Sequence, residues 1–329
     1  MSPLVEPFDP VTAPHSDLAA WTAIFTAGRG ELSGGAPRAE DLAMRLRSRR
    51  AGQGWRWAGR LSAADPVLGV AELRGQPHDE RIGFLRLFVA PVARRMGMGS
   101  ALRETVVERA RALGMERLQS TVPAGEPGEH FARASPYLRT LLRLELQEQC
   151  LDETTLRRCW SLAATPARGY RLTHWEGPAP EGLVRSFGRV MGHLLDAPGA
   201  ALQMVARSWG PAQVREWERE ITEDGSRLVV GAALDRMSDQ VVAATVCTVT
   251  GGVVADQHDT AVMPAHRRRR LASRVKATQA LRVHDLFPHV RALAVTIDQE
   301  NTAMLAVNRS LMYERVAERL LVQESLLVR

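Results

Sequence analysis

The chain has 329 residues, 45% of them hydrophobic, and a formal net charge of +6 at pH 7. This length and apolar content suit two domains with separate cores. No apolar run reaches the roughly 18 residues that span a bilayer, and the start Met1–Pro14 is unlike a secretory signal, so we expect a cytoplasmic protein with no membrane partner. The three cysteines have neither metal-site nor disulfide spacing, so we expect reduced thiols and no metal.

The basic charge has several possible sources. It is carried almost wholly by arginine, with Lys276 as the single lysine. Such a balance is compatible with a nucleic-acid partner and with an anionic small ligand such as a nucleotide cofactor. It is also what an arginine- and alanine-enriched composition from a GC-rich genome produces.

In the first half of the chain, helical and strand patterns alternate. Gly114 is a typical residue for the end of the helix before it. The predicted helices are Ser16–Thr26, Ala39–Arg49, Ser100–Leu113 and His130–Ala134, and the predicted strands are Gly54–Leu61, Val67–Leu73, Ile82–Val89, Arg117–Val122 and the extended or mixed segment Leu138–Leu151.

The second half repeats this order, after a linker that we place at Asp152–Arg168. We therefore divide the chain into domains 1–155 and 156–329. The predicted strands are Tyr170–Trp175, Leu228–Leu234, Val241–Thr248, Val253–Met263, Val290–Thr296 and Val316–Val328, and the predicted helices are Glu181–Leu195, Pro211–Ile221, Leu271–His284 and Asn301–Leu311.

The motif Arg94–Ser100 carries the strongest functional signal. It follows a strand and begins a helix, so backbone N–H groups and the positive end of the helix point at one place. Gly97 and Gly99 allow the backbone to approach a diphosphate closely. An altered version occurs at 266–272, and Val262 and Arg267 lie 173 residues after Val89 and Arg94. An offset near half the chain length indicates a duplicated domain.

Here the chain resembles tandem, bacterial members of the GNAT superfamily of acyl-CoA-dependent N-acetyltransferases. Arg94–Gly99 satisfies the family's Gln/Arg-x-x-Gly-x-Gly/Ala pattern, and 266–272 resembles a second-domain variant, from which Arg268 and Ala272 depart. The second half also carries other residues of that variant, including Thr260, Val262, Thr296, Asn301, Met304 and Asn308. The resemblance implies an α/β (α+β) fold of two GNAT-like domains, each a mixed, mostly antiparallel sheet flanked by helices.

The resemblance also implies acetyl-CoA as cofactor and a set of residues that bind it. In the family, the strand ahead of the turn splays from its neighbour and offers backbone N–H groups to pantetheine and thioester, and the turn binds the diphosphate. The first set is Leu87, Phe88 and Val89 in copy one and Ala261, Val262 and Met263 in copy two. The second set is Arg94, Arg95, Met96, Gly97, Met98, Gly99 and Ser100 in copy one and Arg267, Arg268, Arg269, Arg270, Leu271, Ala272 and Ser273 in copy two.

Catalytic candidates concentrate in copy two. In the family an Asn follows the fifth strand and a Tyr lies seven residues later; here these positions are Asn301, a cofactor and catalytic candidate, and Asn308, which could bond the cofactor sulfur or position a water. His258 is a candidate base because its unperturbed pKa lies near 6.5. Strict alternation would place Asp256, His258 and Thr260 on one face, and Gln257 and Asp259 on the other. The alternative is that His258 is a structural residue of the strand, hydrogen-bonded to a neighbouring side chain.

Copy one lacks this equipment. The Asn position falls on Ala124 or Gly125 and the Tyr position on Phe131, and Glu72 is either an acid or a surface charge. Tyr313 is expected in the core. Copy two is therefore expected to perform chemistry and copy one to bind cofactor or to be structural.

Three functions remain open from the sequence. The first is acetyl transfer by direct attack of a small-molecule or peptide amine, by a monomer or homodimer. The second is non-catalytic acyl-CoA binding or sensing. The third is nucleic-acid association through Arg267–Arg270.

Overall fold

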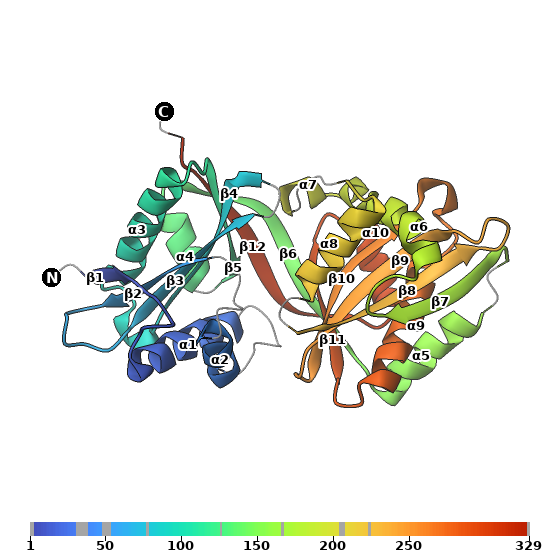
Figure 1. The fold of residues 1–329 in the computed structure, drawn as a ribbon, viewed down its shortest axis with the longest axis horizontal. Coiled ribbons are helices and arrows are strands. Elements are labelled where there is room, and N and C mark those ends of the chain that lie inside the picture. Colours follow the sequence, from blue (N-terminus) through green and yellow to red (C-terminus); the bar gives the residue numbers. More distant parts are fainter. Residues whose placement is uncertain are drawn as a thin grey trace. The chain divides into compact units, whose positions relative to one another are not determined.

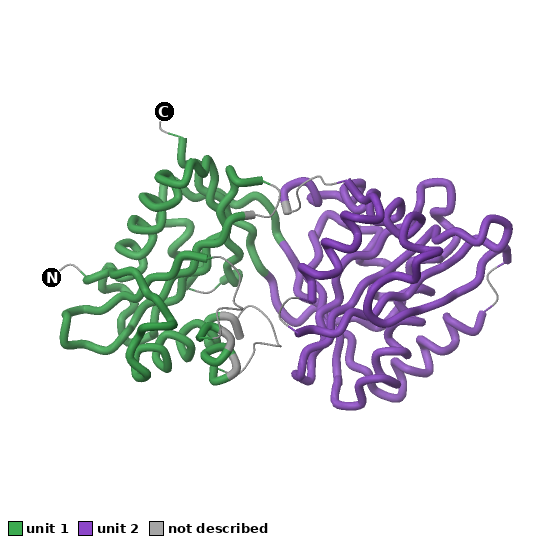
Figure 2. The backbone as a smooth tube through the Cα atoms, in the orientation of Figure 1, with its two compact units in different colours: residues 1–143, 319–329 green, residues 144–318 purple. Residues whose placement is uncertain are grey.

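The computed structural model describes residues 3–30, 39–47, 54–76, 79–125, 127–165, 168–203, 208–222 and 225–327. Two compact units are present, residues 1–143 with 319–329 and residues 144–318 (Figure 2). The sequence repeat instead places a division after residue 155. The two divisions differ because the units exchange chain segments, as described below.

Unit 1 is a sheet with helices on both faces (Figure 1). The sheet order is β1-β2-β3-β4-β5-β12, with only the β4–β5 pair parallel. Helix α1 packs on one face and α3 on the other. The elements that begin in this half are β1 (Leu4–Pro7), α1 (His15–Gly30), α2 (Ala39–Arg47), β2 (Trp55–Arg60), β3 (Gly69–Gln76), β4 (Asp79–Val89), the 3-10 turn η1 (Pro91–Ala93), α3 (Met98–Ala112), β5 (Arg117–Pro123), α4 (Pro127–Ala134) and β6 (Leu138–Cys150).

The two faces of the unit 1 sheet follow from alternation along its strands. Val70 packs with Trp21 and Phe25 of α1. Leu73, an odd number of residues away on the same strand, packs instead with Met98 and Leu102 of α3. The sheet therefore separates two cores, one beneath each layer of helices.

Unit 2 repeats the arrangement with sheet order β7-β8-β9-β10-β11-β6, again with one parallel pair, β10–β11. All nine residues of β9 are buried, because helices cover both faces of the central strands. The elements of this half are α5 (Glu153–Ala164), β7 (Tyr170–Glu176), α6 (Glu181–Met191), η2 (Leu194–Asp196), α7 (Ala200–Gln203), α8 (Pro211–Ile221), β8 (Arg227–Asp235), β9 (Val241–Val249), β10 (Val254–Val262), η3 (Pro264–His266), α9 (Leu271–Leu286), β11 (Ala292–Asp298), α10 (Thr302–Ser310) and β12 (Glu314–Ser325).

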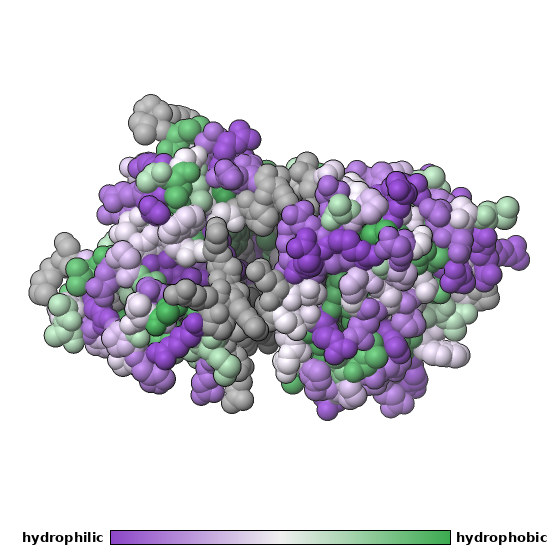
Figure 3. Space-filling model, viewed as in Figure 1, coloured by the Kyte–Doolittle hydropathy of each residue, from purple (hydrophilic) through white to green (hydrophobic). Residues whose placement is uncertain are grey.

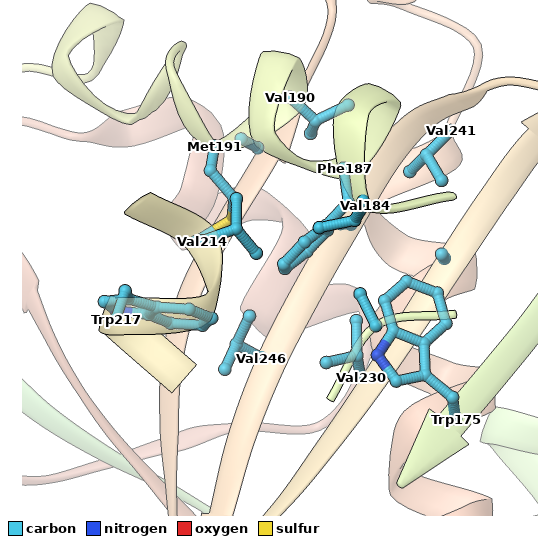
Figure 4. Packing of buried hydrophobic residues seen from close by; sticks show 14 of the residues in the cluster. Trp175, Val184, Phe187, Val190, Met191, Val214, Trp217, Val230, Val241 and Val246 are labelled. Atoms are coloured by element: carbon cyan, nitrogen blue, oxygen red, sulfur yellow. The ribbon is translucent and has the colours of Figure 1, made fainter. Parts of the chain in front are cut away.

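The largest core of unit 2 lies under α6 and α8 (Figure 4). Phe187 of α6 points between Trp175 of β7 and Trp217 of α8, and its ring meets that of Trp175 edge-on at 5.4 Å between centroids. The other face packs against α9, which also carries α5. We call these two sides of the unit 2 sheet the α6/α8 face and the α9 face, and the candidate site is described relative to them.

Each unit takes its last strand from the other half of the sequence. Residues 319–325 of β12 pair antiparallel with β5 in unit 1, and residues 144–150 of β6 pair antiparallel with β11 in unit 2. A buried ion pair reinforces the first exchange, because Arg103 of α3 donates from Nε to Glu324 Oε2 at 2.8 Å and from Nη2 to Oε1. The sequence pattern predicted both strands but neither partner.

The expected linker Asp152–Arg168 is largely a helix. Asp152 accepts a hydrogen bond from the Thr155 backbone N–H at 2.8 Å and so begins α5. Cys159 of this helix is fully buried in unit 2. The short strand β1 and helix α7 were not predicted either, because neither is long enough to show a period.

None of the described helices is long and apolar enough to cross a membrane. Hydrophilic residues cover much of the coloured surface in Figure 3, and hydrophobic residues form small separate patches on it. The cysteines are free thiols, with Cys150 exposed and the other two buried.

Candidate functional site

The two predicted anion turns share one backbone conformation. Arg95 and Gly97 have φ of 64° and 82°, and Arg268 and Arg270, each 173 residues later, have φ of 61° and 59°. In both copies the second of these residues immediately precedes a helix, α3 or α9. Left-handed residues at a helix start direct backbone N–H groups into one concavity, which suits a phosphate. Copy two therefore keeps the turn without its glycine.

The leading arginines hold the turns in place. Arg94 Nε donates to Val89 O and Arg267 Nε donates to Val262 O, each at 3.1 Å. Arg267 also pairs with Asp196, and this hydrogen bond, together with that from His193, lowers the pKa of the Asp196 carboxyl. These two side chains thus connect each turn to the end of the preceding strand.

The remaining turn residues fall into two groups. Arg268, Arg269, Arg270, Arg95, Met96 and Ser100 are exposed, whereas Met98 and Leu271 are buried and can offer only their backbone. Gly99 and Ala272 lie in the first turn of their helices, and Gly99 faces Phe131, whose ring is 3.3 Å from the position of an added Cβ. Ser273 Oγ lies 3.3 Å from Ser310 Oγ of α10.

Both sheets splay ahead of the turn. The parallel β4–β5 pairing covers Ile82–Phe84, and the β10–β11 pairing covers Val254–Asp256. Beyond these points the strand nearest the turn pairs only on its other side. Because backbone N–H groups alternate, those of Leu87 and Val89 point to the splayed side and that of Phe88 to β3.

Two of the three expected backbone donors in copy two face the paired side. The Met263 N–H donates to Val242 O at 2.9 Å, as the Ala90 N–H donates to Leu68 O at 2.8 Å. These groups belong to the ladder on the paired side. By alternation, Ala261 also faces β9, and the N–H of Val262 points into the splay. Of the three residues expected from the sequence, Val262 is the one whose N–H points into the splay.

A β-bulge in β10 rearranges the candidate base. The register with β9 shifts between Gln257 and Thr260. Gln257 Nε2 and Thr260 Oγ1 both reach Thr245 Oγ1, at 3.0 and 2.7 Å, so they share a face. The expected alternation, which put them on opposite faces, is wrong because a bulge inserts one extra residue and turns the strand.

The bulge brings His258 and Asp259 to the α6/α8 face. Asp259 lies two residues before Ala261, which packs under α6 and α8. His258 Nε2 bonds Thr248 Oγ1 at 2.6 Å, and Thr248 lies two residues beyond Val246 of the same core. Burial raises the pKa of the Asp259 carboxyl, and the neighbouring His258 opposes this only in part.

Comparison with known proteins identifies the fold. Residues 29–134 match the acetyltransferase (GNAT) family. Over its full length the chain is similar to a solved tandem GNAT protein from the clavulanic acid biosynthesis pathway, with 21% identity, 100% of both chains covered and a TM-score of 0.76. The chain has a tandem GNAT fold. A GCN5-related N-acetyltransferase from Sphaerobacter thermophilus is also similar, with 13% identity, 98% of this chain and 96% of that chain covered, and a TM-score of 0.70.

A third similar structure is a glucosamine N-acetyltransferase region of a fungal GH3 β-N-acetylglucosaminidase, with 13% identity, 98% of this chain and 38% of that chain covered, and a TM-score of 0.64. No curated protein matches the sequence. Likeness at these identities concerns the fold alone.

The two candidate asparagines, Asn301 and Asn308, both have structural partners. Asn301 caps α10, because its Oδ1 accepts the Met304 N–H at 3.1 Å. Asn308 is fully buried and donates from Nδ2 to Gln147 Oε1 at 2.8 Å. This bond leaves the second Nδ2 hydrogen and Oδ1, which accepts no hydrogen bond within the described residues, for any contact with a cofactor sulfur. Tyr313 is in the core, as expected.

Two residues of note escaped the sequence reasoning. Asp259 was placed on the wrong face, since nothing in the local sequence announces a bulge. Lys276 of α9 is 2% exposed, lies 4.6 Å over the Tyr313 ring, and has a pKa lowered to about 7 by burial. Its position in the α9 stripe was visible in the sequence, but a lysine there reads as a surface residue.

Copy one has a different polar constellation. Glu72 is neither a free acid nor a surface charge, because it is 2% exposed and lies between Arg56, Arg74 and Arg86. Burial alone would raise the pKa of its carboxyl, but the three arginines together outweigh burial and lower it. A carboxylate held in this way is a poor proton acceptor.

Proposed function

We propose that the protein is an acyl-CoA-dependent N-acyltransferase that transfers an acetyl group to an amine, and that unit 2 performs the transfer. The observation that carries this proposal is the β10 bulge at the splay. It brings His258 and Asp259 to the face covered by α6 and α8. These residues lie four and three positions before Val262, the last residue of β10. Bulges commonly redirect side chains next to active sites.

The charge of this face favours an ammonium substrate. Asp256 of β10 pairs with Thr248 of β9, so both side chains lie on the same face of the sheet. Leu293 of β11 faces α9, so by alternation Ala294 and Asp298 point to the α6/α8 face. Glu148 of β6 pairs with Ala294 and therefore points to the same face. Asp298 Oδ2 is buried and accepts no hydrogen bond within the described residues. These acidic residues share a face of the unit 2 sheet with His258, and an acidic face attracts a cationic amine.

The chain's residues fit acetyl-CoA, which supplies the thioester. The turn formed by Arg268–Ser273 offers backbone N–H groups to the diphosphate, and the exposed arginines at the helix start favour an anion there. The Val262 N–H points into the splay, where it would stabilise negative charge that develops on a thioester oxygen during attack.

His258 then handles the proton. In the tautomer whose Nε2–H donates to Thr248 Oγ1, Nδ1 takes the first of the two protons that an ammonium group loses on acylation. The amine nitrogen bonds to the acyl carbon, the carbon–sulfur bond breaks, and the second proton of the nitrogen passes through solvent to the departing thiolate. Asp259 stands beside the imidazolium that forms, as a positioning residue and an opposing charge.

The test is CoA release with a panel of primary amines that differ in net charge. We expect turnover with cationic amines, and a kcat about 10² to 10⁴ lower in His258→Gln with unchanged CoA affinity. The control is His289→Gln, which changes an exposed histidine of unit 2 whose Nε2 lies 3.3 Å from Thr250 O and whose ring meets Phe287 edge-on. Full activity in His258→Gln would move the chemistry elsewhere. CoA binding without turnover of any amine would instead favour the non-catalytic alternative.

A further inference from the structure

The end of β10 is paired on one side only. Its pairing with β11 stops at Asp256, whereas its pairing with β9 continues to Val262. The N–H of the next residue, Met263, donates to Val242 O at 2.9 Å, on the side of β9. In an antiparallel pair the N–H and C=O of one residue point to the same side, so both groups of Val262 point into the splay. The strand end thus needs a contact on the splayed side to keep the direction of the Val262 N–H.

The side chain of Arg267 provides this contact. Its Nε donates to Val262 O at 3.1 Å, so the guanidinium lies on the splayed side of the strand. The side chain is 44% exposed, and a long arginine side chain loses considerable rotamer freedom when it is fixed. A single hydrogen bond at Nε is therefore a weak restraint, and the far end of the guanidinium needs a partner of its own.

Asp196 of η2 is that partner. Its Oδ2 accepts a hydrogen bond from Arg267 Nη2 and lies 3.0 Å from His193 Nδ1. These two contacts, that of Arg267 first, lower the pKa of the Asp196 carboxyl, so this group is ionised at neutral pH. Hydrogen bonds between ionised groups are stronger than neutral ones, and the rigid fork of a guanidinium transmits its orientation from one donor to the next. Asp196 thereby fixes the direction in which Arg267 Nε points.

The element that carries Asp196 is itself packed on the end of β10. η2 contacts β10, and Leu194 of η2 is 6% exposed in the core beneath α6 and α8. Met263 packs against the same core. Asp196 therefore stands on an anchored element beside the strand end, and precise positioning of a site needs such support.

We propose that Asp196 is a positioning residue for acyl transfer in unit 2. It holds Arg267 against the last carbonyl of β10 and so keeps the Val262 N–H directed at the place where a thioester oxygen becomes negative. This role rests on the function proposed above for unit 2. A donor aimed at developing charge acts in the transition state and contributes little to binding of the cofactor.

The charge of Asp196 gives this role a signature. A carboxylate beside the anion turn repels a diphosphate, so removal of its charge should not weaken CoA binding. Loss of the hold on Arg267 should nevertheless slow the transfer. A residue that only supported the turn would show the opposite pattern, with weaker CoA binding and an unchanged kcat.

The test compares Asp196→Asn with wild type in the full-length protein. CoA affinity is measured by calorimetry, and kcat by CoA release from acetyl-CoA with cationic amines. We expect kcat to fall about three- to tenfold, the loss of one charge-assisted hydrogen bond in a partly exposed pair, with CoA affinity equal to or above that of wild type. Asp196→Glu keeps the charge and should restore part of kcat. The matched control is Asp239→Asn, which removes the charge of an exposed carboxylate 2.7 Å from Arg171 and should behave as wild type does.

A double-mutant cycle with Arg267→Met decides whether Asp196 acts through that arginine. In the Arg267→Met background, Asp196→Asn should change kcat no further, because the group that it holds is gone. Arg267→Ala takes the place of Arg267→Met if circular dichroism shows that the latter fails to fold. An unchanged kcat in Asp196→Asn, or an equal effect of this change in both backgrounds, overturns the proposal.

Hydrogen exchange gives a readout that does not require turnover. Peptides that contain Met263 should exchange severalfold faster in Asp196→Asn, because the end of β10 opens more often, whereas peptides from β8 should not change. Unchanged exchange at Met263 overturns the proposal whatever kcat does. If wild type turns over no amine, the function proposed for unit 2 fails, and exchange at Met263 alone then decides whether Asp196 holds the strand end.

Discussion

Replacement of one leucine near the end of the chain should destabilise the first unit and leave the second intact. Leu320 is 1% exposed and packs with Ala132 and Val322 in unit 1, although it belongs to the last strand of the sequence. A buried Leu→Ala change costs about 2–5 kcal/mol through lost transfer free energy and the residual cavity. Because domains are stable by about 5–15 kcal/mol, Leu320→Ala should remove a large share of the stability of unit 1.

Hydrogen exchange resolves where this loss occurs, since protection reports opening of each segment. In Leu320→Ala, peptides from β5 and α3 should exchange faster, and peptides from α9 should not. The reciprocal control is Leu151→Ala. Leu151 follows β6 in the first half of the sequence, is 7% exposed, and packs with Val283 and Leu293 in unit 2. Faster exchange of α9 in Leu320→Ala, with β5 unchanged, would refute the strand exchange.

Two further predictions concern single backbone or titratable positions. The pKa of Lys276 lies near 7 in the folded protein, so the unfolded chain binds an extra proton between about pH 7 and its ordinary value of 10.5. Wild-type stability should therefore rise with pH across this window. Lys276→Met should gain on the order of a few kcal/mol at pH 7 and nothing above pH 10, and urea unfolding at several pH values measures the difference. A pH-independent difference would contradict it. At the anion turns, Gly97→Ala should lower the free energy of unfolding by about 1 kcal/mol, because Gly97 has a φ of 82°. Arg270→Gly should be neutral or slightly stabilising. Thermal unfolding that shows the opposite order would contradict the role of backbone strain in these turns.

Periodicity was sufficient for the regular elements of the fold. The helix α3 and the strands before and after it carry clear periods and a glycine stop, so the sequence located them closely. The same holds for α8, whose predicted bounds Pro211–Ile221 are those observed. The segment at Asp152 was misread, because proline and small residues after Ala164 concealed the Asp cap that begins α5.

Features that depend on residues far apart in the sequence could not be predicted from local sequence patterns. The strand exchange depends on which edge of a sheet a segment joins, and β6 and β12 carry similar apolar patterns. The β10 bulge depends on register with β9, so His258 was found by residue type whereas Asp259 was placed on the wrong face. Glu72 was read as an isolated charge, because its arginine partners come from three neighbouring positions on β2, β3 and β4.

The exchanged strands also govern the order in which the units can be completed during synthesis. A ribosome produces β1–β5 long before residues 319–325, so the edge of β5 has no partner strand until almost the whole chain has emerged. Unit 2, by contrast, has its β6 strand made before any of its own helices. An exposed strand edge recruits other chains. Cells that stall translation in the second half of this message would therefore accumulate an aggregation-prone N-terminal fragment, and a supplied peptide of 314–327 would suppress that aggregation.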